Sequence, residues 1–249
     1  MNILKSIIVW LAGIAIMLIF LPVTFIVWLL ALPFDRNRTI THWLLISQGW
    51  VISHLLPIWK ISIEGREKAK RGTTYVIICN HQSILDILVL NCLRYKFKWI
   101  SKSEVYGVPV LGWYVKMADY ITVDRKDLVS KGKMIEESYE CLKKNVSIMI
   151  FPEGTRSIDD YQIGLFKKGA FLLAIKTRTP ILSVIMDGTG SVLPKHGIIF
   201  GGFHKIDIRV LDPVSPESFG TDDCEVLAIK FQEMMKEELQ KLRNERGSK

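Results

Sequence analysis

The chain has 249 residues and lacks several features that mark common structural classes. It contains no repeat of fixed period, which excludes collagen-like and solenoid architectures. It has only four cysteines, at positions 79, 92, 141 and 224, and no CxxC pair, so we expect neither a disulfide framework nor a metal site. Apolar residues make up 49% of the chain and charged residues 23%, close to the globular average, which excludes a wholly disordered chain.

Acidic residues are the scarcer charged class, with 25 against 33 lysines and arginines, so the formal net charge is +8. A basic chain indicates an anionic partner, which could be nucleic acid, an anionic bilayer or a phosphorylated substrate. No motif of a nucleic-acid-binding fold is present. We therefore expect a bilayer or a phosphorylated ligand as partner, and no nucleic acid.

Charge is absent altogether near the N-terminus, where the 29 residues from Ser6 to Phe34 carry no ionisable side chain. As a straight helix they would cover about 43 Å, more than the ~30 Å of a bilayer core, so tilt or a break is needed. Pro22 offers a break and Pro33 a stop. A second uncharged stretch runs from Thr39 to Trp59. We predict that residues 1–59 form a membrane-embedded helical hairpin, which either spans the bilayer or lies in one leaflet.

Two other interpretations of this segment are a cleaved signal peptide and a buried core helix. The uncharged run is too long for either, and it lacks a small-residue cleavage pattern. Directly after it, residues 60–71 hold five basic and two acidic side chains. Basic residues beside an apolar segment favour the cytoplasmic face and attract anionic headgroups. We therefore expect a cell-membrane location with the following domain on the cytoplasmic side.

The remainder of the chain alternates short β-branched runs with amphipathic segments. This alternation predicts an α/β domain over residues 60–249, with a central, mostly parallel or mixed β-sheet flanked by helices. Strands are predicted at residues 74–79, 98–101, 120–123, 146–151, 181–186 and 206–211, and helices at 83–95, 109–117, 127–145, 168–176 and 225–246.

A His–Asp pair follows the first predicted strand, in the segment Asn80-His81-Gln82-Ser83-Ile84-Leu85-Asp86. Catalytic groups favour the carboxyl ends of strands, and a carboxylate that orients an imidazole makes a general base. Five positions along a helix put side chains about 140° apart, so the pair meets only if His81 precedes the helix and Asp86 lies in its first turn. The alternative is that Asp86 has only a structural role, because Ser83 and Asp86 also fit a capping box. A serine nucleophile is not indicated, because the sequence contains no G-x-S-x-G motif.

A second polar loop follows the strand predicted at 146–151, with the sequence Phe151-Pro152-Glu153-Gly154-Thr155-Arg156-Ser157. Glycine permits close approach of a ligand, and an arginine fork matches phosphate oxygens. Glu153 could orient that guanidinium or bind a substrate hydroxyl. The alternative is an ordinary polar turn with a surface ion pair. Other cations also follow predicted strands or begin helices, namely Lys102, Arg125, Lys167 and Lys168.

Taken together, these blocks resemble the glycerolipid acyltransferases, most closely the bacterial 1-acylglycerol-3-phosphate O-acyltransferases. The resemblance covers roughly Lys60 to Asp212. It departs from the family where Pro180-Ile181-Leu182-Ser183-Val184 replaces the usual Pro-Ile-x-Pro-Val, and where Tyr120-Ile121-Thr122-Val123-Asp124-Arg125 replaces a block ending Phe-Ile-x-Arg. Neither departure touches His81 or Asp86.

The resemblance implies that His81, oriented by Asp86, deprotonates the sn-2 hydroxyl of 1-acylglycerol-3-phosphate (lysophosphatidic acid). The hydroxyl oxygen would attack the thioester of acyl-CoA or acyl-carrier protein, giving phosphatidic acid for phospholipid biosynthesis without an acyl-enzyme. No metal or cofactor is implied, because the thioester is a co-substrate. The resemblance assigns the acceptor's phosphate and its pocket to Arg156, Arg125, Lys102, Glu153, Gly154 and Thr155.

Two other functions fit the same residues. One is acyl transfer to a different lyso-lipid acceptor. The other is a membrane-anchored protein that binds phosphate and catalyses nothing. The first differs from our prediction in acceptor preference, and the second in predicting that His81 is dispensable.

Overall fold

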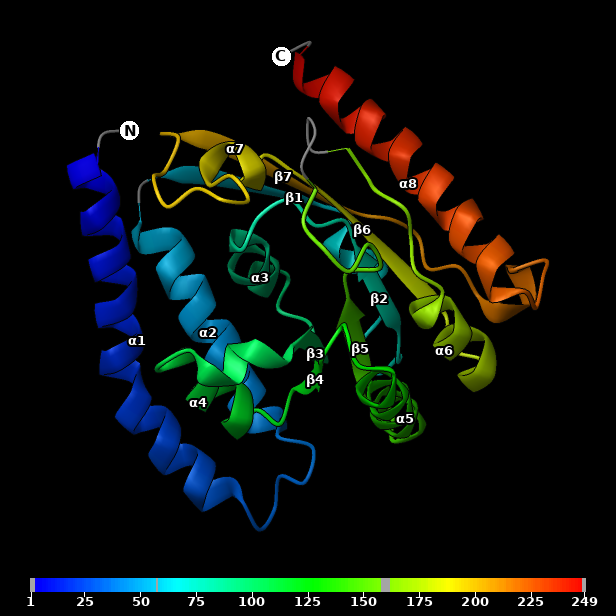
Figure 1. Cartoon of the computed structure of the whole chain (residues 1–249), viewed down its shortest axis with the longest axis horizontal. Coiled ribbons are helices and arrows are strands. Elements are labelled where there is room, and N and C mark those ends of the chain that lie inside the picture. Colours follow the sequence, from blue (N-terminus) through cyan, green and yellow to red (C-terminus); the bar gives the residue numbers. More distant parts are fainter. Residues whose placement is uncertain (1–2, 57, 158–161, 248–249) are drawn as a thin grey trace.

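A computed structural model describes residues 3–56, 58–157 and 162–247 of the chain. The described strands form one seven-stranded sheet in the order β1-β7-β6-β2-β5-β3-β4 (Figure 1). The strands are β1 (Trp59–Glu64), β2 (Val76–Cys79), β3 (Phe97–Lys102), β4 (Ile121–Val123), β5 (Ser147–Ile150), β6 (Ile181–Asp187) and β7 (His204–Val210).

The central strands are parallel and buried on both faces. β2 pairs in parallel with β6 on one side and with β5 on the other, and β3 and β4 continue the parallel set. All residues of β2 and β6 are buried, which suits their runs of apolar side chains. β7 is antiparallel to β6, and β1 pairs in parallel with β7 at the edge. The predicted α/β class with a mixed sheet is confirmed.

Helices cover both faces of the sheet and make a three-layer structure (Figure 1). One core cluster joins the sheet to α1, α3 and α4, and the other joins it to α5, α6 and α8. The helices are α1 (Ile3–Ala31), α2 (Thr39–Leu55), α3 (Leu85–Leu90), α4 (Leu111–Met117), α5 (Leu128–Lys143), α6 (Gly169–Thr177), α7 (Thr189–Val192) and α8 (Cys224–Gly247). Short 3-10 helices lie at Arg66–Lys68, Asn91–Leu93, Ser103–Gly107 and Pro216–Ser218.

Helix α1 lies along the domain rather than projecting from it (Figure 1). Of the helices in the described residues, it is the one long and apolar enough to cross a membrane. Its outer face is exposed and apolar, while side chains such as Val9 pack into the core. Hydrogen bonds along its length join it to the domain, among them those from Trp10 Nε1 to the Ile198 carbonyl (2.8 Å), from Tyr114 Oη to the Met17 carbonyl (2.7 Å) and from Gln48 Nε2 to Thr24 Oγ1 (2.6 Å).

Pro22 does not end the first helix as a break would. The helix continues through this residue to Ala31 and bends along its course (Figure 1). A proline removes one backbone donor and is a common cause of such bends. Pro33 follows the helix end, as expected for a stop.

Helix α2, the second half of the predicted hairpin, packs against the domain. His42 in α2 hydrogen-bonds to the Tyr120 hydroxyl (2.8 Å) and to the Tyr95 carbonyl (2.9 Å). Both ring nitrogens of His42 are therefore satisfied by protein groups, whereas the buried Thr41 and Ser53 hydroxyls of α2 have no hydrogen-bond partner within the described residues. Residues 1, 2 and 57 of the predicted hairpin lie outside the described residues. The division of the chain at residue 59 stays a prediction.

Each strand and helix predicted from the sequence is present, with ends shifted by a few residues. Two elements were not predicted. Strand β1 begins at Trp59, in the segment interpreted only as a basic cluster, and the short helix α7 follows β6. Both matter to the architecture, since β1 closes one edge of the sheet and α7 contacts the site described next.

Candidate active site

The sheet brings the predicted site residues to a single edge. Parallel strands β6, β2, β5, β3 and β4 are neighbours in that order, so their carboxyl ends lie in a row. His81 follows β2, the Glu153–Arg156 loop follows β5, Lys102 ends β3 and Arg125 follows β4. Neighbouring strands are about 4.8 Å apart, so the strand ends that carry His81 and Arg125 are roughly 14 Å apart. Long side chains from these ends can reach one ligand.

His81 and Asp86 are in direct contact, as the helical spacing requires. His81 precedes α3, and Asp86 lies in the first turn of α3. His81 Nδ1 is 2.7 Å from Asp86 Oδ2, and the Asp86 side chain is completely buried. An ionised carboxylate only accepts hydrogen bonds, so Nδ1 carries the proton and Nε2 of the neutral ring keeps a lone pair.

The His81 ring is held by a stacking contact on its face as well as by the hydrogen bond to Asp86 at its edge. It stacks on Phe151, with ring centroids 3.9 Å apart and an interplanar angle of 11°. Phe151 in turn stacks on Trp99. Within the described part of the chain, no residue hydrogen-bonds to His81 Nε2, and 12% of the side chain is exposed. This nitrogen is therefore held in place and open to a ligand proton.

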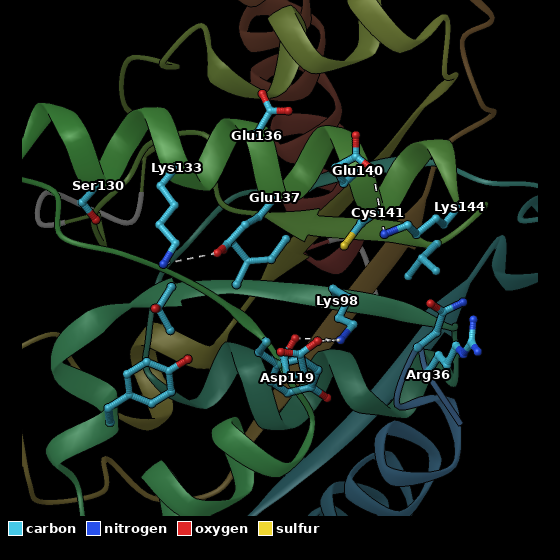
Figure 2. Close-up of a pocket in the computed structure, with 16 residues that line it drawn as sticks. Arg36, Lys98, Asp119, Ser130, Lys133, Glu136, Glu137, Glu140, Cys141 and Lys144 are labelled. Atoms are coloured by element: carbon cyan, nitrogen blue, oxygen red, sulfur yellow. Dashed lines mark hydrogen bonds and ion pairs between the residues drawn. The ribbon is translucent and has the colours of Figure 1, made fainter. Parts of the chain in front are cut away.

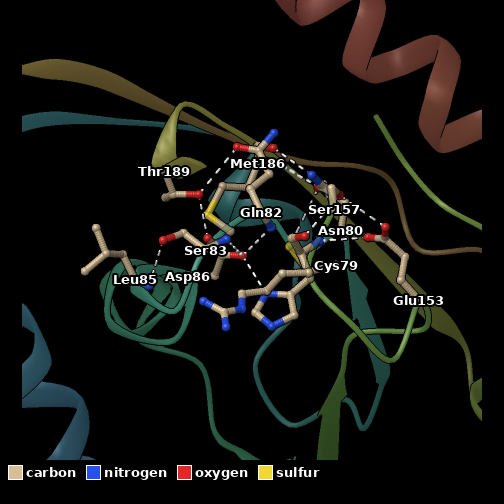
Figure 3. A network of polar contacts seen from close by, with 12 residues as sticks. Cys79, Asn80, Gln82, Ser83, Leu85, Asp86, Glu153, Ser157, Met186 and Thr189 are labelled. Atoms are coloured by element: carbon tan, nitrogen blue, oxygen red, sulfur yellow. Dashed lines mark hydrogen bonds and ion pairs between the residues drawn. The ribbon is translucent and has the colours of Figure 1, made fainter. Parts of the chain in front are cut away.

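The Asp86 carboxylate accepts three further hydrogen bonds (Figure 3). Oδ2 accepts from the backbone N–H groups of Gln82 (2.7 Å) and Ser83 (3.0 Å), and Oδ1 accepts from the Thr189 hydroxyl (2.5 Å). The bond from Ser83 is the one a capping box would make. The two interpretations of Asp86 thus hold together, because one carboxylate caps the loop and orients His81.

The residues on either side of His81 are clamped to the end of β6 (Figure 3). The Asn80 amide both donates to the Met186 carbonyl and accepts from the Met186 N–H, each at 2.8 Å. Gln82 Nε2 donates to Asp187 Oδ1 (3.0 Å), and Gln82 Oε1 accepts from Gly188 N–H (3.1 Å). The backbone of His81 is therefore held between two residues whose side chains hydrogen-bond to the end of the neighbouring strand.

Glu153 supports His81 from the opposite side. Its Oε1 accepts from the His81 backbone N–H (2.9 Å), and Oε2 accepts from Gly164 N–H (2.8 Å) and the Ser157 hydroxyl (3.3 Å). Burial raises the pKa of Glu153, and the bonds from Gly164 and His81 oppose that rise. Ser157 N–H donates to the His81 carbonyl (2.8 Å). Both Glu153 oxygens are occupied by protein donors, so its geometry is that of a positioning group.

The cations of the row are largely uncompensated. Arg125, Arg156, Lys167 and Lys195 form no ion pair with the carboxylates of the described residues, whereas Lys102 pairs with Glu104. A Cβ on Gly154, which has φ +68°, would be 2.7 Å from Lys167 Nζ, so this ammonium lies over the glycine. Lys168 instead pairs with Glu225 at 2.8 Å. Thr155 is exposed beside Arg156. Such a group of cations fits an anionic ligand.

A separate polar recess of about 520 Å³ lies between β4 and α5 (Figure 2). Six of its charged side chains are paired with one another: Lys98 with Asp119 (3.0 Å), Lys133 with Glu137 (3.7 Å) and Lys144 with Glu140 (3.8 Å). None of the predicted site residues lines it. We therefore keep the candidate site at the carboxyl edge of the sheet.

The sequence analysis missed Thr189 and Lys195 as site residues. Thr189 follows β6, and Lys195 Nζ donates to the Arg156 carbonyl at 2.6 Å. Site residues were expected after four of the predicted strands, but not after the strand at 181–186. The same expectation, applied there, points to Asp187, Gly188 and Thr189.

Comparison with known proteins identifies the family to which this chain is similar. Residues 60–187 match the family model for the acyltransferase domain. The chloroplast 1-acyl-sn-glycerol-3-phosphate acyltransferase of Brassica napus is 38% identical over 72% of this chain and 52% of its own length. The 1-acyl-sn-glycerol-3-phosphate acyltransferase of Saccharomyces cerevisiae is 29% identical over 83% of this chain and 68% of its own. This chain spans about half the length of its plant relatives.

The fold is also found in a solved structure. The crystal structure of the 1-acyl-sn-glycerophosphate acyltransferase from Thermotoga maritima superposes with a TM-score of 0.81 at 24% identity. The match covers 97% of this chain and 96% of that one. It includes the N-terminal helices as well as the α/β domain, so the whole arrangement recurs.

We predict that Thr189→Val destabilises the protein, because it removes the one side-chain hydroxyl that donates to Asp86 Oδ1. A hydrogen bond to a charged group contributes about 1.5–3 kcal/mol, equivalent to a Tm decrease of about 3–12 °C in a chain of this size. Thermal unfolding in detergent measures the change. Thr189→Ser keeps the hydroxyl and should recover most of it, and Thr177→Val, whose hydroxyl bonds only neutral groups, is the control. An unchanged Tm for Thr189→Val would contradict the contact.

Proposed function

This chain belongs to the acyltransferase family, and we propose that it transfers a fatty acyl group from a thioester to the sn-2 hydroxyl of 1-acylglycerol-3-phosphate, giving phosphatidic acid. The observation that carries the proposal is the His81–Asp86 pair with an open Nε2, beside Arg125 and Arg156, which form no ion pair with any carboxylate that the structure describes. A hydroxyl to be activated and a phosphate to be bound are the two groups that this acceptor offers. The curated relatives named above support the same acceptor.

In the proposed reaction, His81 Nε2 removes the proton of the sn-2 hydroxyl as its oxygen attacks the thioester carbonyl. The tetrahedral intermediate collapses with cleavage of the carbon–sulfur bond, and the proton held by His81 passes to the departing thiolate. Asp86 keeps the reactive tautomer and stabilises the imidazolium formed in the first step. No acyl-enzyme, metal or cofactor is needed, and acyl-CoA or acyl-carrier protein serves as co-substrate.

The acceptor's phosphate is assigned to the cations of the row. Arg156 follows the neighbouring strand β5, and its planar fork matches phosphate oxygens. Arg125 lies farther along the row and Lys102 between them, with Lys102 shared by Glu104. Gly154 and Thr155 leave room beside Arg156, while Glu153 acts through the backbone of His81. The proposed phosphate pocket therefore contains the predicted residues, except that Glu153 positions His81 instead of contacting the ligand.

We further propose that α1 lies in one leaflet of the cell membrane, with the catalytic domain on the cytoplasmic side. The contacts at Trp10 and Thr24 are 14 residues apart, about 21 Å along a helix. If α1 crossed the bilayer, the loop at Ile198 and helix α4 would have to enter the hydrocarbon, where irregular lipid-exposed backbone is not tolerated. The basic residues of 60–71 favour the cytoplasmic face.

We predict that His81→Ala lowers kcat by about 100-fold to 10,000-fold, the usual contribution of a general base. Acyl transfer from a radiolabelled thioester to lysophosphatidic acid in detergent measures the effect, and circular dichroism checks the fold. His54→Ala removes an exposed histidine of α2 and serves as the control. A kcat close to that of the parent protein would show that His81 is not the general base, and would favour the non-catalytic alternative.

We predict that Arg156→Ala chiefly weakens use of the acceptor. Loss of a charged hydrogen bond of about 1.5–3 kcal/mol corresponds to a roughly 10-fold to 150-fold fall in kcat/KM for lysophosphatidic acid. The KM for the thioester should change little. Arg178→Ala, at an exposed arginine that pairs with Glu217, is the matched control. If acceptors without a phosphate monoester react equally well in the parent protein, a different lyso-lipid is the substrate.

We predict that the protein stays with the membrane fraction in about 1 M salt, where the Debye length falls to about 3 Å. The reason is the exposed apolar face of α1, whose burial in lipid does not depend on charge. Sedimentation followed by blotting measures the bound fraction, and a mild detergent should release it. Complete release by salt alone would show that attachment is electrostatic.

A further inference from the structure

The segment between α7 and β7 connects the candidate active site to α1. We call residues 193–203 the strap. At one end, the Ser83 hydroxyl donates to the Leu193 carbonyl (2.7 Å), and Lys195 donates to the Arg156 carbonyl (2.6 Å). At the other end, Trp10 Nε1 donates to the Ile198 carbonyl (2.8 Å), and the Phe200 N–H donates to Ser6 Oγ (3.0 Å). The strap therefore touches the His81 loop, the Arg156 loop and the apolar helix.

The outer surface of the strap is apolar although it is a loop. Ile198 is 75% exposed, Ile199 43% and Phe203 66%, while Phe200 is buried and its ring lies 5.3 Å from that of Trp10. One aromatic side chain thus anchors the strap to α1, and three large apolar side chains point outward. Loops that remain in water are usually polar, so this surface indicates a further contact.

This apolar surface continues onto the outer face of α1. Leu4, Ile7, Ile8 and Leu11 are each about half exposed or more. Between α1 and the strap lies an apolar groove of about 510 Å³, lined by Val9, Ile58 and Phe203 among others. Lys5 lines this groove, and Lys195 lies three positions before Ile198 in the strap. An apolar centre with a cationic border is typical of a surface that rests on anionic lipid.

We infer that the strap is a membrane-docking element, which inserts Ile198, Ile199 and Phe203 into the boundary between headgroups and acyl chains of an anionic bilayer. The inference rests on the proposed location of α1 in one leaflet, and not on the proposed reaction. Continuity with the α1 face and the bordering cations favour lipid over a protein partner. Through Ser83 and Lys195, the strap connects this contact to the loops that carry His81 and Arg156.

Site-directed spin labelling of the full-length protein tests the docking directly. A nitroxide is attached to the cysteine of Ile198→Cys, after Cys141→Ser and Cys224→Ser remove the half-buried thiols, since Cys79 and Cys92 are buried. The matched control is Ile229→Cys on α8, where the native isoleucine is 55% exposed and α8 covers the opposite face from α1 (Figure 1). Both proteins are bound to vesicles made of equal parts phosphatidylcholine and phosphatidylglycerol.

Power saturation then compares collision of each label with oxygen, which concentrates in lipid, and with a water-soluble nickel complex. We expect the label at position 198 to favour oxygen and the label at position 229 to favour nickel. Equal nickel access at both positions would overturn the inference and assign the surface to a partner other than lipid. This readout needs no turnover, so it stands or falls separately from the proposed function.

A second measurement concerns the consequence for the site. The triple variant Ile198→Ser, Ile199→Ser, Phe203→Ser should lower the rate with acceptor embedded in vesicles by at least about fivefold, through lost apolar burial. Its rate with a short-chain acceptor in detergent should be unchanged. Val226→Ser with Ile229→Ser is the control for exposed apolar residues. An unchanged rate with vesicles would show that the strap has no part in docking.

Discussion

The buried Asp86 carboxylate is the group on which the geometry of the candidate site depends. A carboxylate removed from water is costly unless donors surround it. Here the donors are the His81 imidazole, two backbone N–H groups and the Thr189 hydroxyl. The donors come from the loop after β2 and the start of α7, and the carboxylate itself lies at the start of α3, so three segments must be in place at once. The same requirement that stabilises the charge also fixes the ring that we propose as the base.

The position of each side chain relative to its own helix or strand was predictable, because it depends on residues that are close in the sequence. Helical periodicity required His81 before a helix and Asp86 in its first turn, and the structure has that arrangement. Apolar runs predicted the central strands for the same reason. Strand β1 has the alternation of apolar residues with Lys60, Ser62 and Glu64 that indicates an edge strand half exposed to solvent, and it was missed because this segment was interpreted only by its charges. The order of strands depends on pairing between distant segments, and nothing in the local pattern specifies it.

Side-chain direction could not be predicted from the motifs. In the sequence, Glu153 lies next to Gly154 and Arg156 and has the character of a ligand-binding carboxylate. In the structure it faces the backbone of His81 and Gly164, because the loop turns its side chain inward at the end of β5. Thr189 and Lys195 lie more than 100 positions after His81, and only the folded sheet brings them to it. Pro22 likewise lies within a continuous helix, although a break was predicted at this proline.

Cys79 lies two positions before His81, but its thiol is buried and its pKa is raised. It is fully buried at the end of β2, and burial raises its pKa, with Asp86 and Glu153 adding to the rise. The thiolate is the form that alkylating reagents and peroxides attack. Burial, with a smaller contribution from Asp86 and Glu153, thus disfavours the thiolate form of this residue. Thiol-blocking reagents are therefore expected to react slowly with Cys79 while the chain stays folded.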